Sequence, residues 1–80
     1  MNKAQKASYN RSQVDMLECQ AKVHMARGEW AVAISRLKNA ISAANKMVYS
    51  PYATERIGKL KDMIAQCKDM REILRKADTR

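Results

Sequence analysis

Apolar residues recur every three or four positions through most of this 80-residue chain, which is the spacing of one face of an α-helix. The pattern is clearest in the middle of the chain, where it runs through Trp30, Ile34, Leu37, Ile41, Ala44 and Val48. Similar patterns precede and follow it. We therefore predict helices over about 9–27, 29–48 and 51–77, preceded by a flexible basic lead-in over residues 1–8.

Two residues mark the breaks between these helices. Gly28 follows the last apolar position of the first pattern, where glycine commonly ends a helix, and Arg27 suits a last helical turn. Pro51 is placed at the first position of the third helix, where its missing N–H costs nothing. Short connections favour antiparallel neighbours, so we predict an all-α, antiparallel up-down-up three-helix bundle over residues 9–80.

The first predicted helix is apolar on two sides. Its main stripe contains Val14, Leu17, Ala21 and Met25. A second stripe lies about 200° away by the 100° step of the helix and contains Met16, Cys19, Val23 and Ala26. Such a helix either packs between two others or keeps one apolar side for a partner. We expect the second stripe to exceed what three helices can cover, and an uncovered apolar strip is an interaction surface.

The third predicted helix combines an apolar stripe with a basic one. Its expected core positions are Leu60, Met63, Cys67, Met70, Leu74 and Ala77, with Ile57, Ile64 and Ile73 alongside. The basic stripe contains Lys61, Lys68, Arg71 and Arg75. Four cations on one side could meet phosphates or an acidic helix. A solvated face beside the core is the simpler explanation.

The formal net charge of +8 favours an anionic partner, which could be nucleic acid, an anionic membrane surface or an acidic protein. The positive excess is +3, +2 and +3 over residues 1–27, 28–50 and 51–80, so there is no basic arm. An even spread of this kind is often only a solubility feature. No recognition-helix pattern for reading bases is present, although nucleic-acid binding stays an alternative.

The residues that usually carry catalysis or bind metals are few. His24 is the only histidine, and Cys19 is about 140° away from it around the helix. Cys19 and Cys67 form no CxxC pair, so we expect no metal site and no cofactor, and we expect both thiols to be reduced core residues rather than a disulfide. No sequence signature of an enzyme or of a membrane span is present. We predict a non-enzymatic, cytoplasmic protein.

Residues 21–41, AKVHMARGEWAVAISRLKNAI, resemble the helical hairpin of a tetratricopeptide repeat. The matching positions are Ala21, Gly28, Trp30, Ala33, Leu37 and Ala40. No second copy is present, and Asn45 stands where the repeat usually has proline. In length the chain is more similar to the MIT (microtubule-interacting and trafficking) domain, a three-helix bundle with such a hairpin. GEWAVAISRLKNAI resembles its second helix, except that Leu37 replaces an aromatic residue, and MREILRKA resembles its closing pattern. The resemblance implies docking of a partner's short helix along the third helix.

The sequence thus predicts a protein-interaction module that docks a partner helix, an acidic segment or a second copy of itself. The expected partner-binding residues are Met16, Cys19 and Val23 in the first helix and Lys61, Lys68, Arg71 and Arg75 in the third. Two alternatives remain open: a basic accessory protein that binds nucleic acid, and a small inhibitor or accessory factor of a larger enzyme. The last alternative would use the same surfaces.

Overall fold

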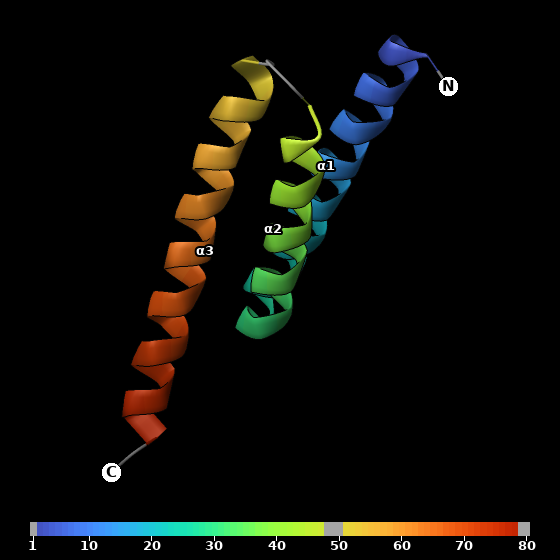
Figure 1. Ribbon diagram of the computed structural model, residues 1–80. Coiled ribbons are helices and arrows are strands. Elements are labelled where there is room, and N and C mark those ends of the chain that lie inside the picture. The colour runs from blue at the N-terminus through green and yellow to red at the C-terminus, as the bar shows by residue number, and fades with distance from the viewer. Residues whose placement is uncertain (1, 48–50, 79–80) are drawn as a thin grey trace.

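The computed structural model describes residues 2–47 and 51–78, which form three α-helices. These are α1 (Lys3–Ala26), α2 (Trp30–Asn45) and α3 (Pro51–Asp78). Consecutive helices are antiparallel, and α2 packs against both of its neighbours (Figure 1). The predicted all-α, up-down-up bundle is therefore confirmed.

Two of the predicted helix boundaries are wrong. α1 begins at Lys3 instead of about residue 9, because Asn2 and Gln5 form a capping box in which each side chain bonds the other's backbone N–H. Residues 3–8 are therefore helical and are not a separate lead-in. α2 ends at Asn45, before the predicted end at 48, and Val48 itself lies outside the described residues. α3 begins at Pro51, as predicted.

The turn between α1 and α2 depends on Gly28. Its φ of 75° lies in the left-handed region, which glycine adopts without steric cost. The Gly28 N–H donates to the Met25 carbonyl at 3.0 Å, and the Glu29 N–H donates to the His24 carbonyl at 2.8 Å. These two bonds form a Schellman motif, which satisfies carbonyls at the end of α1 and reverses the chain within three residues.

The core is built around one side of α2. Small residues dominate it, so the helices approach one another closely. Its buried members are Val14 and Ala21 from α1, Ala33, Ile34, Leu37, Ala40, Ala43 and Ala44 from α2, and Leu60 and Cys67 from α3. α2 supplies most of this set although it is the shortest helix, so it is the element that holds the other two together.

The end of α3 extends beyond the start of α2 (Figure 1). Because α3 has 28 residues and α2 has 16, the last turns of α3 extend past the start of α2, where the Trp30 side chain still reaches them. Every residue from Lys68 to Ala77 is exposed. The predicted core positions Met70, Leu74 and Ala77 are therefore wrong, as is Ile73. The result is an elongated molecule, with a radius of gyration of 14.5 Å compared with about 12 Å for a compact domain of this length.

A polar cluster joins α1 to the beginning of α3. The Arg56 guanidinium donates to the Asp15 carboxylate and lies 2.7 Å from the carboxylate of Glu18, which is buried. The Tyr52 hydroxyl donates to Asp15 at 2.8 Å, and the Arg11 guanidinium lies 4.4 Å from the centre of the Tyr52 ring. Because removing one partner from a buried ion pair leaves the other charge uncompensated, we expect the loss of Arg56 or Glu18 to destabilise the contact between α1 and α3.

Two leucines of α3 test the extent of the core. Leu60 is completely buried and Leu74 is 47% exposed. We expect Leu60→Ala to lower the free energy of unfolding by about 3 kcal/mol because it leaves a cavity. The matched change Leu74→Ala should lower it by less than about 1 kcal/mol. Urea unfolding followed by circular dichroism measures both values, and equal losses would contradict the boundary of the core described here.

The polar cluster predicts a dependence of stability on alkaline pH. Burial raises the pKa of Tyr52, and the hydrogen bond to Asp15 acts in the same direction, while the charge of Arg56 opposes them. A raised pKa means that the neutral hydroxyl stabilises the folded state below its unfolded-state pKa of about 10, and that this contribution is lost as the pH rises through the folded-state value. We expect Tyr52→Phe to cost about 1 kcal/mol at pH 8. The difference between the two proteins should shrink above pH 10, and a difference that grows there would contradict this assignment.

Candidate interaction surfaces

The outer face of α1 is the first candidate surface, and we define it by six exposed residues: Tyr9, Ser12, Met16, Cys19, Val23 and Ala26. Met16 is 45% exposed and Val23 is 50% exposed. These fractions are large for apolar side chains on a helix that also contributes buried residues to the core. The three residues predicted for binding on α1 therefore lie together on one accessible face, although Cys19 is not the core residue that we expected.

The outer face is uncovered because both neighbours of α1 lie on its other sides. Val14 and Ala21 point into the core against α2. Asp15 and Glu18 point to Arg56 of α3. By the 100° step of a helix, Met16 lies 160° from Val14 and on the opposite side of α1. Covering this face would require a helix that the described part of the chain does not contain.

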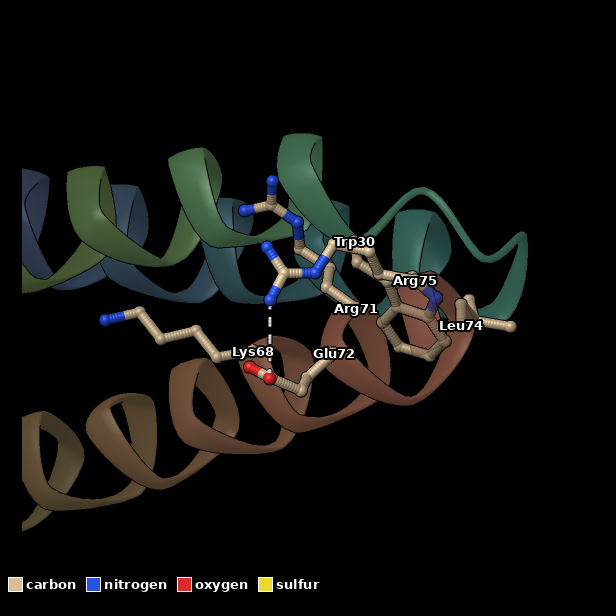
Figure 2. Close-up of a pocket in the computed structure, with 6 residues that line it drawn as sticks. All are labelled: Trp30, Lys68, Arg71, Glu72, Leu74 and Arg75. Atoms are coloured by element: carbon tan, nitrogen blue, oxygen red, sulfur yellow. Dashed lines mark hydrogen bonds and ion pairs between the residues drawn. The ribbon is translucent and has the colours of Figure 1, made fainter. Parts of the chain in front are cut away.

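The second candidate surface is a pocket between the start of α2 and the end of α3, which we call the basic pocket (Figure 2). Its volume is about 510 Å³, and its lining residues are Trp30, Lys68, Arg71, Glu72, Leu74 and Arg75. Figure 2 shows the Trp30 indole beside Leu74, with the arginine side chains reaching from α3 toward α2. One wall is therefore apolar and the other is cationic.

The charges of the basic pocket are unbalanced. Arg75 lies 3.4 Å from Glu72, the single carboxylate in the lining. Among the described residues, no carboxylate forms an ion pair with Lys68 or Arg71. Two cations without a counter-charge beside an indole favour a ligand that is anionic and has an apolar or flat group.

The structure brings together three of the four predicted basic residues. Lys68, Arg71 and Arg75 line the basic pocket, whereas Lys61 is exposed and does not. The spacing of apolar residues predicts Trp30 in the core stripe of α2, and it gives no sign that Trp30 forms a wall of this pocket. Its position follows from the antiparallel packing, which brings the first residue of α2 beside the last turns of α3. None of the outer-face residues of α1 lines the pocket.

The remaining reactive side chains have structural surroundings. His24 lies 3.2 Å from the Glu29 carboxylate, beside the turn between α1 and α2. Cys67 is buried, and this burial raises the pKa of its thiol. Both cysteines are free. Within residues 2–47 and 51–78 we find no group of three His, Cys, Asp or Glu side chains that could hold a metal ion, and no helix apolar and long enough to span a bilayer.

Comparison with known proteins returned no protein-family model, no curated protein and no solved structure that matches this chain. The resemblance to the tetratricopeptide hairpin and the MIT domain therefore rests on the sequence positions alone.

Proposed function

We propose that this protein is a non-catalytic interaction module, and that its outer face on α1 docks a helix from a partner or from a second copy. The observation that carries the proposal is the exposure of Met16 and Val23 on a helix whose opposite side contributes Val14 and Ala21 to the core. A solvated helix face is normally polar, since amphipathic helices of globular proteins keep charged and polar side chains on that side. We therefore expect the regularly spaced apolar residues of the outer face to be buried by a binding partner.

The basic pocket extends the proposal to an acidic partner segment. Arg71 and Lys68 offer charge-assisted hydrogen bonds to carboxylates, and Trp30 with Leu74 offers an apolar wall for one anchoring side chain. Lys61, the fourth residue of the basic stripe, would add only general attraction from outside the pocket. A small inhibitor or accessory factor of a larger enzyme would use the same two surfaces.

The outer face can be tested by adding charge to it. We expect Met16→Glu and Val23→Glu to reduce partner capture from an extract of the expressing cells at least tenfold, because each buries a carboxylate in the interface. Val32→Glu is the matched control: Val32 is a 40% exposed apolar residue on α2, outside both surfaces. Circular dichroism checks that all three variants stay folded. Undiminished capture by the folded Met16 and Val23 variants would refute the proposed face.

Nucleic-acid binding is the second candidate function, and the basic pocket is the observation that favours it. Bases can stack on an indole while Lys68, Arg71 and Arg75 meet the phosphates, which requires no sequence readout. With about three phosphates neutralised, affinity for a single-stranded oligonucleotide should fall about 20-fold between 50 and 200 mM salt.

A salt titration with a fluorescent single-stranded oligonucleotide tests this candidate. If the pocket binds nucleic acid, Lys68→Glu and Arg75→Glu should each weaken binding and flatten the salt dependence. Lys38→Glu makes the same charge change at an exposed position of α2 that does not line the pocket. Equal losses from all three variants would mean that net charge, and not the pocket, attracts the oligonucleotide.

A further inference from the structure

The outer face of α1 has a seven-residue repeat. Tyr9, Met16 and Val23 are seven positions apart, and each is followed three positions later by a small residue: Ser12, Cys19 and Ala26. These are the a and d positions of a two-stranded coiled coil. All six residues are exposed, with a bulky side chain at every a position and a small one at every d position. This alternation limits which helix could cover the face.

We infer that the outer face binds the same face of a second copy of this chain, with the two α1 helices antiparallel. The inference rests on the proposed function, and it specifies one binding partner for the outer face, which is a second copy of the chain. Reversing one helix exchanges the order of a and d positions, so each a residue meets a d residue of the other copy. When the two α1 helices are aligned so that the two-fold axis between them passes between Leu17 and Glu18, every bulky residue of one copy faces a small residue of the other. The facing pairs are Tyr9 with Ala26, Val23 with Ser12, and Met16 with Cys19.

The residues that flank the face fit the same register. On one side, Asp15 comes opposite Lys22 of the second copy, and the two-fold symmetry repeats this pair. The Asp15 side chain is 53% exposed, and its hydrogen bonds to Tyr52 and Arg56 both use Oδ1. On the other side, Gln13 comes opposite Gln20. The register therefore forms an opposite-charge pair of Asp15 with Lys22 twice near its centre and a like-charge pair of Lys6 with Arg27 once at each end, between chains of net charge +8.

Two other occupants fit less well. A parallel pair of α1 helices would place Met16 against Met16 and Tyr9 against Tyr9. It would also lack the Asp15–Lys22 pairs of the antiparallel register. An acidic partner would find more counter-charges at the basic pocket, because the outer face is flanked by Gln13, Gln20 and Arg27 on one side and by charges of both signs on the other.

The length of the face sets the expected strength of association. Tyr9 to Ala26 spans about 26 Å of helix. A single helix pair of this length buries less than a standard protein interface, so the dimer should dissociate on dilution through the micromolar range. Its mass must therefore be measured over a concentration series.

The first test is sedimentation equilibrium of the full chain from micromolar to millimolar concentration at moderate salt. We expect a monomer–dimer equilibrium that Met16→Glu weakens at least tenfold and that Val32→Glu leaves unchanged. A short bis-maleimide linker should also join Cys19 to Cys19 of the second copy, with Cys19→Ser as the control, since Cys67 is buried. A dimer that Met16→Glu does not weaken would overturn the inference.

The second test addresses the register. In the antiparallel arrangement, the double variant Gln13→Lys with Gln20→Glu creates two ion pairs between copies, and we expect the dimer to tighten severalfold. In a parallel arrangement the carboxylate introduced by Gln20→Glu lies beside Asp15 of the other copy, and the dimer would weaken, which overturns the antiparallel register. A monomer at every concentration overturns the dimer itself. If the protein is a monomer but Met16→Glu and Val23→Glu still abolish partner capture, the proposed function is retained. If these variants do not reduce capture, both the dimer and the proposed function are rejected.

Discussion

The burial of one side of α2 is the constraint on which the rest of the structure depends. α1 and α3 make their main apolar contacts with α2 and meet each other chiefly through the cluster of Arg56, Asp15, Glu18 and Tyr52. The core is rich in alanine, so it is thin and holds the helices at close range. Because α2 is too short and presents too little apolar surface to cover both neighbours, much of α1 and α3 stays exposed. Both candidate surfaces lie on these exposed parts.

The two surfaces have different origins. The outer face exists because α1 carries apolar residues on two sides and, within the described residues, only one of these sides packs against another helix. The basic pocket exists because α3 extends past the start of α2. The side of α3 that carries Leu60 and Cys67 continues near its end with Arg71 and Leu74, and Arg75 lies next to them. The first surface is apolar and nearly neutral, whereas the second is cationic with an indole wall. They are suited to different occupants and can be filled at the same time.

Much of the fold could be predicted from the sequence because its signals are local. Gly28 and Pro51 mark the turns through backbone geometry, and the spacing around Leu37 identifies the core side of α2. The start of α1 was missed because the capping box of Asn2 and Gln5 carries no apolar signal. The core was extended too far along α3 because periodicity does not reveal where the neighbouring helix ends.

The candidate surfaces were only partly predictable for the same reason. The second apolar side of α1 predicts the exposure of Met16 and Val23, but the same sequence also favours Cys19 as a core residue, and the structure shows it exposed. The grouping of Lys68, Arg71 and Arg75 with Trp30 depends on residues about 40 positions apart, and only the antiparallel packing brings them together. The pairing of Arg56 with Glu18 is of the same long-range kind.

The position of Trp30 has a practical consequence. It is the only tryptophan of the chain, and it lies at the junction of α2 and α3, in the wall of the basic pocket. Indole fluorescence responds to local polarity, so the emission maximum of the unlabelled protein reports on this junction alone. Separation of α3 from α2 would shift the emission to longer wavelength, while a ligand seated on the indole would shift or quench it. The native sequence thus contains an optical sensor for the end of the molecule where the helices part.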